Sequence, residues 1–397
     1  MTSLIKRLAL VLVVSLFLSS CQSKISDQEI IAPIIPTLTP SLSPSPTPAP
    51  TVLPSETPII TPAPTIVVSP TPAPTVAEPK LNIKDYFPIK NVYFQYKLFT
   101  PDGNNKPQTE ETYLEFFDTK SRLVQKRVLN SSKKPQIKIY QLKNGEILLL
   151  DQKENLQYIY NFLKNAPKNG EILLKSPLVV GTSWKINGGE SFIYSTNKKI
   201  GILGGLSTIQ VNTNYNNGNT RISHFAKDLG LVCEYVYDSN QVLLSSYELS
   251  SYEKDVSFKQ SVKIYFLEYM TNQKKYVKKS LLHSPNNSME NIFTQWLQTA
   301  PSNDLLSLNT KINKISLGKN NSVTIDFSSQ ISNNMVRQNE KAFLQTIADT
   351  IGSYYNAKRV YITINDQLYE SNYIFLTEND YFVPNTKDAS SFSKISN

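Results

Sequence analysis

The run Met289-Glu290-Asn291-Ile292-Phe293-Thr294-Gln295-Trp296-Leu297 carries its apolar side chains at helical spacing. Positions i, i+3, i+4, i+7 and i+8 share one face of an α-helix, and here they are Met289, Ile292, Phe293, Trp296 and Leu297. Asn287 is the expected start, with Glu290 as its partner in a capping box. Ala300-Pro301 ends the run. The segment therefore predicts an amphipathic helix whose apolar face packs against a neighbouring element.

Strands and a second helix are expected around this first helix. Their order is Val262–Tyr269, Lys275–Leu282, the first helix, Ile312–Leu317, Ser322–Phe327, a helix over about 338–354, Val360–Ile364 and Tyr369–Leu376. The second helix turns one apolar face inward, made of Phe343, Leu344, Ile347, Ala348 and Ile351. The order β-β-α-β-β-α-β-β predicts helices packed on one sheet, which is an α+β domain over residues 260–376.

Residues 81–255 have the pattern of a β-rich domain. Short apolar runs are separated by turn signals such as Asn144-Gly145, Asn187-Gly188 and Asn217-Gly218, and Asn-Gly between such runs favours a hairpin. The expected strands are Val92–Phe99, Tyr113–Phe117, Leu123–Val128, Gln136–Leu142, Ile147–Asp151, Gln157–Phe162, Phe192–Lys199, Ser207–Thr213, Thr220–Ala226, Leu231–Tyr237 and Val242–Tyr252. They predict one large, twisted antiparallel sheet or an open barrel.

The first twenty residues have the pattern of a secretory signal peptide. Lys6 and Arg7 precede an apolar run from Leu8 to Leu18, and Leu18-Ser19-Ser20-Cys21 follows. The run is shorter than the roughly 20 residues that cross a bilayer. Leu-Ser-Ser-Cys resembles the bacterial lipobox, which implies cleavage before Cys21 and acylation of its thiol, with two or more acyl chains as a stable anchor. The alternative is an ordinary signal peptide with an incidental cysteine.

Two further segments are expected to lack a fold. Residues 31–79 hold 15 of the 24 prolines, and Thr-Pro-Ala-Pro-Thr occurs at 47–51, 61–65 and 71–75. Such a composition cannot build a core and favours an extended spacer. Residues 21–80 are therefore predicted to be a disordered Pro/Thr-rich linker, which would hold the folded part away from the membrane. Residues 377–397 are predicted to be a disordered tail.

Charge and cysteine content narrow the class of protein. The formal net charge of +9 falls to +7 without residues 1–20, because these include Lys6 and Arg7 and no acidic residue. The basic residues are scattered and no nucleic-acid motif is recognisable, so nucleic acid is not an expected partner. With Cys21 acylated, Cys233 has no intrachain partner, and no disulfide framework is expected. Cys233 lies in an alternating strand pattern and is expected to be a buried, small apolar residue.

Catalytic and metal-binding patterns are not found in the sequence. His224 and His283 are isolated, so no metal site or cofactor is predicted; His224 is expected to pack in a strand and His283 to be solvated in a loop. Gly201–Gly205 is expected to be a bulge or tight turn. A glycosidase would need two carboxyls in one cleft, and the candidates are Glu110, Glu111, Glu115 and Asp326. Asp326, at a strand end, is expected to cap a turn instead. No catalytic residue is predicted.

Two phrases in the β-rich region resemble phrases that recur in lipoprotein domains of Gram-positive bacteria. They are Leu173-Leu174-Lys175-Ser176-Pro177-Leu178-Val179-Val180-Gly181-Thr182-Ser183-Trp184 and His224-Phe225-Ala226-Lys227-Asp228-Leu229-Gly230-Leu231-Val232. Where this chain has the second phrase, those lipoprotein domains more often have Tyr-Ala-Lys-Gly-Val-Gly. The resemblance implies a fold and an envelope location, and it implies no activity.

Residues 260–376 resemble the GerMN domain of sporulation and spore-germination lipoproteins. The similarity lies in Val262–Phe266, Phe293–Pro301, Ser322–Ser328, Thr346–Ile351 and Val360–Asp366. The family's first helix normally ends in Leu-x-x-Gly-Pro, its central strand reads Val-x-Val-Asp-Leu-Ser, and its last strand usually ends in Asp-Gly. This chain has Ala300 and Asp366 where the family has glycine, and it lacks the Ile-Pro after the first helix, which affects loop geometry more than the fold.

The resemblance implies a non-enzymatic lipoprotein on the extracytoplasmic face of the cell membrane. It would support sporulation or spore germination through protein–protein contacts between membrane and wall. Its expected partners are the membrane through Cys21, and envelope proteins or further copies of itself through the GerMN-like domain; a cell-wall polymer is a further candidate. The alternatives are an envelope lipoprotein whose β-rich domain binds a lipid or glycan, and a cell-wall hydrolase.

Overall fold

The computed structural model describes residues 80–392 except 88, 102–107, 132, 269–270, 302–305 and 334–338. These residues belong to one compact unit, Val76–Asn397. Residues 1–79, with the expected signal peptide, Cys21 and the linker, lie outside the described residues. Among the described residues, no helix has the length and apolar character needed to cross a membrane.

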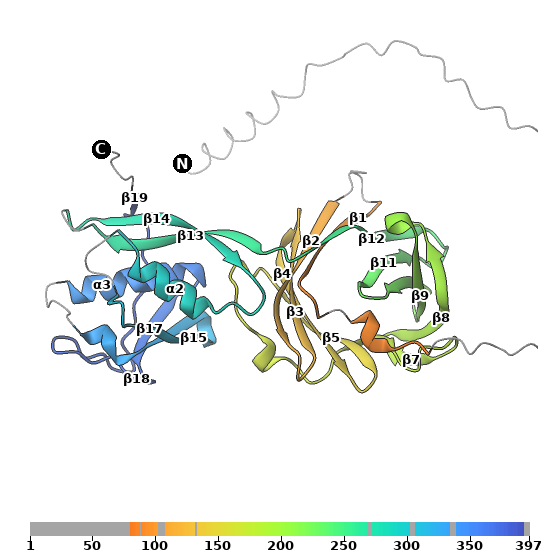
Figure 1. Ribbon diagram of the computed structural model, residues 1–397, viewed down its shortest axis with the longest axis horizontal. Coiled ribbons are helices and arrows are strands. Elements are labelled where there is room, and N and C mark those ends of the chain that lie inside the picture. Colours follow the sequence, from red (N-terminus) through yellow and green to blue (C-terminus); the bar gives the residue numbers. More distant parts are fainter. Residues whose placement is uncertain are drawn as a thin grey trace, which may run out of the picture. The chain divides into compact units, whose positions relative to one another are not determined.

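The first part of the chain forms a single antiparallel sheet of 12 strands, which confirms the predicted large antiparallel sheet (Figure 1). Its spatial order is β6-β5-β4-β3-β2-β1-β12-β11-β10-β9-β8-β7. The strands are β1 Val92–Phe99, β2 Gln108–Asp118, β3 Leu123–Asn130, β4 Lys133–Lys143, β5 Glu146–Glu154, β6 Glu171–Lys175, β7 Ser183–Ile186, β8 Gly189–Ile200, β9 Leu206–Tyr215, β10 Thr220–Ala226, β11 Gly230–Tyr237 and β12 Leu243–Lys254.

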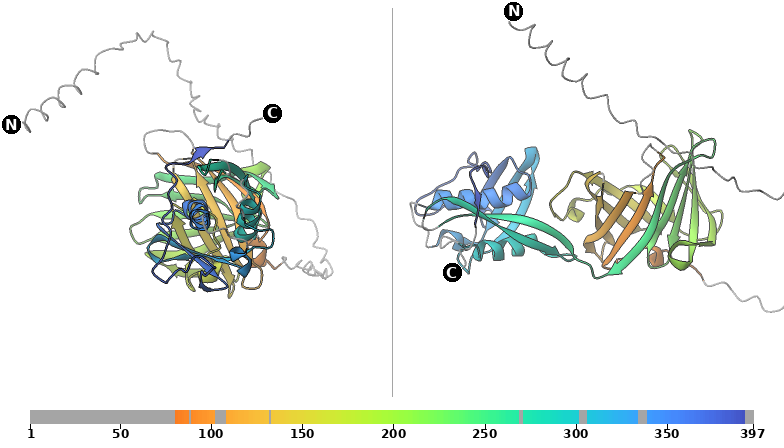
Figure 2. Two further views of the ribbon diagram at one scale, coloured as in Figure 1. Left: turned by 90° about the vertical axis from the view of Figure 1, so that its left-hand side faces the viewer. Right: turned by 90° about the horizontal axis from the view of Figure 1, so that it is seen from above.

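The sheet is strongly curved, and its two halves face each other across the concave side (Figures 1 and 2). A core cluster on that side joins residues of both halves, among them Leu114, Val124, Trp184 and Ile193. At the two edges, the Trp184 indole of β7 donates a hydrogen bond to the Ile172 carbonyl of β6 at 3.0 Å. The short helix η1 (Ile83–Tyr86) belongs to this core through Ile83 and Tyr86.

One strand prediction is wrong in the region of residues 155–162. Gln157–Phe162 was expected to be a strand, but these residues form no strand and lead into the short helix η2 (Leu163–Asn165). Their backbone groups bond to side chains of β3 in place of a neighbouring strand, as described below. A left-handed residue, Asn155 with φ 61°, lies where the chain leaves β5.

The second part of the chain has the predicted order β-β-α-β-β-α-β-β, but its strands belong to two sheets and not to one. One sheet contains β13 (Phe258–Leu267), β14 (Lys274–His283) and β19 (Ser390–Ser391); the other contains β15 (Ile312–Gly318), β16 (Ser322–Phe327), β17 (Arg359–Ile364) and β18 (Gln367–Leu368). The helices α2 (Met289–Gln298) and α3 (Glu340–Ile347) lie between the β13–β14 hairpin and the second sheet (Figure 1). Thr350 accepts a hydrogen bond from the Tyr265 amide of β13 and Thr294 accepts one from the Ile312 amide of β15, so the helical layer is bonded to both sheets.

Three differences from the predicted elements concern the two helices and the last strand of the second part. Ser288, and not Asn287, caps α2: its hydroxyl accepts a hydrogen bond from the Asn291 amide at 3.2 Å. After α3 the helix continues as a π-turn, Ala348–Gly352. The expected strand Tyr369–Leu376 does not form: β18 ends before it, at Leu368, and within it only an isolated bridge joins Glu370 to Phe375.

Residues 377–392 also differ from the disordered tail that is expected over 377–397. Phe382 is buried and pairs with Val360 through two backbone hydrogen bonds of 2.8 Å. Further along, β19 pairs with β14, and Phe392 packs on Phe266 with ring centroids 5.5 Å apart. The reason is that apolar residues in this segment complete the core of the second part.

Candidate functional site

Strand β3 separates two environments because successive side chains point to opposite faces of a sheet. Val124, Lys126 and Val128 line a cavity on the concave side. Gln125 and Arg127 point to the other face and bond to residues 156–162, which we call the strap. The candidate site therefore has two parts, a cavity and a buried polar cluster, that share one strand.

The cavity has a volume of about 340 Å³, within the size range of sites for small ligands. Its residues come from η1, from β1 to β6 and from β10 to β12, so both halves of the curved sheet contribute. Much of its wall is apolar, including Phe87, Val124, Ile147, Leu173, Phe225 and Leu231.

Two lysines face each other inside this cavity. Lys126 of β3 and Lys138 of β4 are direct cross-strand partners, an arrangement in which like charges repel. The Lys126 ammonium lies over the Phe94 ring at 4.8 Å and near the Tyr140 ring at 5.9 Å. Burial, followed by the charge of Lys138, lowers the pKa of Lys126 to about 8. For Lys138, burial lowers the pKa, but Tyr140, Glu110 and Glu234 outweigh it and raise the net value.

The acidic groups of the cavity already have partners. Glu110 accepts a hydrogen bond from the Tyr247 hydroxyl at 2.8 Å, and Tyr247 stacks on Tyr96 with ring centroids 4.2 Å apart. Elsewhere in the lining, Arg221 donates to Glu171 at 2.7 Å and lies 3.9 Å from Glu234. In the part of the chain that the structure describes, by contrast, neither Lys126 nor Lys138 lies within ion-pair distance of a carboxylate.

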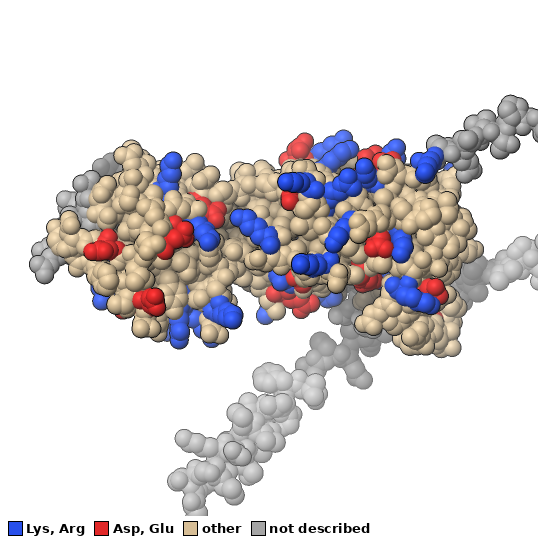
Figure 3. Space-filling view, turned by 90° about the horizontal axis from the view of Figure 1, so that it is seen from below, with Lys and Arg blue, Asp and Glu red and all other residues tan. Residues whose placement is uncertain are grey.

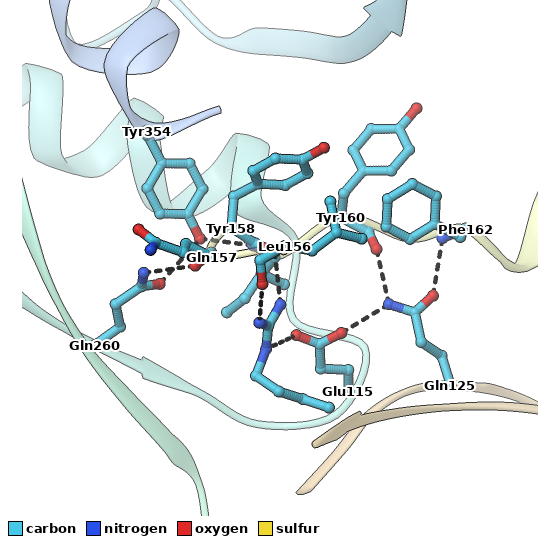
Figure 4. Close-up of polar contacts among 11 residues, drawn as sticks. Glu115, Gln125, Leu156, Gln157, Tyr158, Tyr160, Phe162, Gln260 and Tyr354 are labelled. Carbon is cyan, nitrogen blue, oxygen red and sulfur yellow. Dashed lines mark hydrogen bonds and ion pairs between the residues drawn. The ribbon is translucent and has the colours of Figure 1, made fainter. Parts of the chain in front are cut away.

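On the opposite face, Glu115, Gln125 and Arg127 form a fully buried cluster, which we call the brace (Figure 4). The Arg127 Nε atom lies 2.5 Å from Glu115 Oε1, and Gln125 Nε2 donates to Glu115 Oε2 at 2.7 Å. Burial raises the pKa of Glu115, while Arg127 and Gln125 act to lower it.

The brace holds the strap by its backbone. Arg127 donates to the carbonyls of Leu156 and Tyr158 at 2.7 and 2.6 Å (Figure 4). Gln125 donates to the Tyr160 carbonyl at 2.8 Å and accepts from the Phe162 amide at 2.9 Å. Two side chains thus satisfy backbone groups that a strand partner would otherwise satisfy, which is why the strap needs no place in the sheet.

The other side of the strap contacts the second part of the chain. The Ile159 amide donates to the Tyr354 hydroxyl at 2.9 Å, and Gln260 Nε2 donates to the Gln157 carbonyl at 2.7 Å (Figure 4). The rings of Tyr158 and Tyr355 meet edge to face at 5.2 Å. The strap is therefore packed between the brace and the helical layer.

A second connection joins β2 to the loop before α2. The side chain of Asn286 accepts from the Phe117 amide at 2.9 Å and donates to its carbonyl at 3.1 Å, while the Asn286 amide donates to the Glu115 carbonyl at 3.0 Å. These bonds lie beside the register shift of β2 between Leu114 and Phe116, where the ladder to β3 is interrupted. One hydrophobic cluster accordingly includes Phe116, Ile137 and Ile159 together with Phe293 and Ile351.

Residues 263–370 match the family model Germane, described as sporulation and spore germination. The chain carries a Germane domain. The match falls within the region 260–376, for which the sequence resembles GerMN, and it confirms that resemblance.

Several solved structures are each similar to part of the chain. The first GerMN domain of the sporulation protein GerM from Bacillus subtilis has 17% sequence identity, covers 31% of this chain and 97% of its own, and has a TM-score of 0.23. A candidate lipoprotein from Parabacteroides distasonis has 15% identity, coverage of 42% and 98%, and a TM-score of 0.29. MucB in the Pseudomonas aeruginosa MucA/MucB complex has 9% identity, coverage of 50% and 73%, and a TM-score of 0.25. No curated protein matches the chain.

The predicted environment is correct for His224 and wrong for His283. His224 packs in β10 as expected, with Nδ1 3.1 Å from the Thr208 hydroxyl. His283 was expected to be solvated but is buried at the end of β14, where the Germane domain meets Phe116 of β2 at a ring distance of 5.3 Å. Neither ring nitrogen of His283 has a hydrogen-bond partner among the described residues. Burial lowers the pKa of both histidines to about 4.

The candidate carboxylates fall into separate structural roles. Glu110 faces the cavity and Glu115 belongs to the brace on the other face, while Glu111 accepts from the Tyr113 hydroxyl. In the Germane domain Asp326 caps the loop after β17, as expected: its Oδ1 accepts from the Asp366 amide and the Thr363 hydroxyl, each at 2.7 Å.

Other predicted positions can be placed as well. Cys233 is buried and free, as expected, and burial raises the pKa of its thiol to about 12. Gly201–Gly205 forms a tight turn between β8 and β9, with φ of 82° at Gly204 and 113° at Gly205. Within the described ranges, no group of three His, Cys, Asp or Glu side chains could hold a metal ion. On the face shown in Figure 3, Lys and Arg are spread among Asp and Glu without forming one patch.

Proposed function

We propose that this chain is a non-enzymatic, lipid-anchored envelope protein that supports sporulation or spore germination through protein–protein contacts. The Germane domain at residues 263–370 carries this proposal, because its family is described by these two processes. The packing of that domain on the strap and β2 supports it, since such contacts present sheet and Germane domain together to a partner. Binding partners and self-association would use the remaining sheet edges and helix faces of the Germane domain.

The proposed role in sporulation or germination is tested by deleting the gene and scoring spore formation and germination separately. A defect in either score that the wild-type gene restores would support the proposal. Normal scores in both would overturn it and leave a general envelope role. A pull-down with the full chain from sporulating cells then tests the contact mechanism, because a scaffold must capture an envelope protein or a second copy.

Membrane attachment is proposed to occur through Cys21, with residues 1–20 as signal peptide and residues 21–80 as linker. Replacing Cys21→Ala should release the chain from the membrane fraction or leave its precursor uncleaved, and labelling with radioactive palmitate should disappear. Cys233→Ala is the matched control and should keep the label, because the Cys233 thiol is buried. Stable membrane attachment of a mature Cys21→Ala protein would contradict the anchor.

A second candidate function is the binding of a lipid or glycan by the β-rich domain. The cavity of about 340 Å³ between the two halves of the sheet favours it, because a solidly packed sheet would offer no space for a ligand. Wall hydrolysis is the remaining alternative, and incubation of the chain with peptidoglycan tests it. Release of soluble fragments by the wild-type chain would overturn the non-enzymatic proposal.

A further inference from the structure

The cavity-facing side of β4 changes from polar to apolar along the strand. Its alternate residues read Lys134, Gln136, Lys138, Tyr140 and Leu142. A second hollow, of about 530 Å³, contains Lys133, Lys134 and Gln136, and it shares Glu110, Val128 and Lys138 with the cavity. At the other end of the gradient Leu142 belongs to the apolar core of the concave side. The site is therefore polar where the two hollows adjoin, with Glu110 and Lys138 on their shared wall, and apolar further in.

Among the described residues, neither of the two facing lysines has a carboxylate as an ion-pair partner. Both side chains are partly buried, and like charges directly opposite each other destabilise a sheet. The Phe94 ring under Lys126 provides a cation–π contact, but it does not neutralise the charge. Among the described residues, no protein group bonds to the Tyr140 hydroxyl, which comes from the same face of β4. An anion placed here would satisfy all three groups.

We propose that this cavity binds a single-chain anionic amphiphile. Its head, a carboxylate or a phosphate, lies between Lys126, Lys138 and the Tyr140 hydroxyl, and its hydrocarbon tail lies against Val124, Ile147 and Phe225. The inference rests on the second candidate function, ligand binding by the β-rich domain, and it adds the chemical class of the ligand. A glycan fits less well, because the wall beyond Tyr140 is apolar and the acidic groups are already bonded to tyrosine or arginine.

The test measures binding by isothermal titration calorimetry to four probes: decanoate, decyl phosphate, decanol and butyrate. The protein is the chain from residue 76, because Val76–Asn397 is a compact unit that contains every residue of the site. Decanoate or decyl phosphate should bind at least about tenfold more tightly than decanol, since a charge-assisted hydrogen bond contributes about 1.5–3 kcal/mol and 1.4 kcal/mol corresponds to tenfold. Butyrate should bind weakly, because it lacks the tail. The tighter of the two anionic probes identifies the head group.

The double variant Lys126→Met/Lys138→Met tests whether the anionic head binds between these two lysines. It should lose about 10- to 100-fold in affinity for the anionic probes and keep its affinity for decanol. Lys143→Met, an exposed lysine on the same strand, is the matched control and should bind like the wild type. The double variant removes repulsion, so its melting temperature should not fall, and thermal unfolding verifies that it is folded.

The outcomes separate the inference from the function on which it rests. Equal binding of decanol and both anions would overturn the anionic head but leave a ligand-binding cavity. Anion binding that the double variant retains would overturn the proposed position. No binding of any ten-carbon probe would overturn both the inference and the candidate function.

Discussion

Arg127 is a buried cation that bonds to three residues of the brace and the strap. Its replacement should lower the free energy of unfolding. Arg127→Met leaves Glu115 Oε1 and two strap carbonyls without their donor and removes the positive charge beside the buried carboxylate. Breaking one partner of a buried pair costs about 3–5 kcal/mol, and we expect a loss of that size in the free energy of unfolding, measured by urea denaturation.

Two controls test the assignment of that loss to the buried charge. Glu115→Leu/Arg127→Met removes both charges and should be more stable than Arg127→Met alone. Lys153→Met, which breaks the partly exposed pair with Asp151, should change the free energy by less than about 1 kcal/mol. A single Arg127→Met variant as stable as Lys153→Met would show that the brace contributes no such stabilisation.

His283 should make stability depend on pH. Its pKa of about 4 in the folded chain lies below the ordinary value of 6.5, so the unfolded chain binds the proton more readily. The stabilisation is complete above pH 6.5 and is lost as the pH falls toward 4, by about 3 kcal/mol for a shift of this size. His283→Leu should therefore be less sensitive to acid in this window, as measured by denaturation at several pH values. His224, shifted in the same direction, acts equally in both proteins, so parallel pH profiles would contradict the prediction.

Single residues were predictable where their own strand decides their environment. Cys233 and His224 lie in alternating segments, and Asp326 ends one, so local pattern sufficed. His283 and Glu115 were not predictable in this way, because Phe116 and Arg127, which surround them, come from other strands. The sequence contains a weak indication of the brace. Gln125 and Arg127 alternate with Val124 and Val128 in one strand, and this pattern indicates polar partners on the second face of the sheet.

At the scale of elements, the cap of α2 gives a separable prediction. The Ser288 hydroxyl accepts from the Asn291 amide and also donates to Glu290 at 2.8 Å. Ser288→Ala should lower the free energy of unfolding by about 1 kcal/mol, because the first turn loses its acceptor. Ser353→Ala is the control, since Ser353 is exposed within helical backbone and should tolerate alanine. Equal effects in urea denaturation would exclude a capping role for Ser288.

Most elements were predictable because periodicity and turn residues are local signals. Thr220–Ala226 coincides with β10, and the order of strands and helices in the Germane domain was correct. The strap was not predictable from these signals, because Tyr158, Tyr160 and Phe162 alternate as the residues of a strand do. Its departure from the sheet depends on bonds to Gln125 and Arg127, which lie about thirty residues earlier. The division into two sheets likewise depends on which strands pair, and periodicity does not determine pairing.

At the scale of the whole described chain, sheet and Germane domain share one hydrophobic cluster, which no sequence pattern indicated. The hydrogen bond from Ile159 to Tyr354 joins residues 195 positions apart. Because the strap is bonded on one side to the brace and on the other to Tyr354 and Gln260, disorder in one part removes packing from the other. Such reciprocal contacts favour unfolding as a single unit.

Differential scanning calorimetry of the chain should accordingly show one unfolding transition. Tyr354→Ala removes the hydroxyl that Ile159 needs and the ring that packs on Phe293 at 5.2 Å, so it should split the transition into two or broaden it markedly. Tyr361→Ala lies in the same domain, but its ring contacts Tyr381 and not the strap; it should lower the melting temperature and keep a single transition. Two transitions in the wild type, or equal splitting in both variants, would mean that the strap does not couple the sheet to the Germane domain. Coupling through the strap would let a partner bound to the Germane domain act on β3, whose other face lines the cavity.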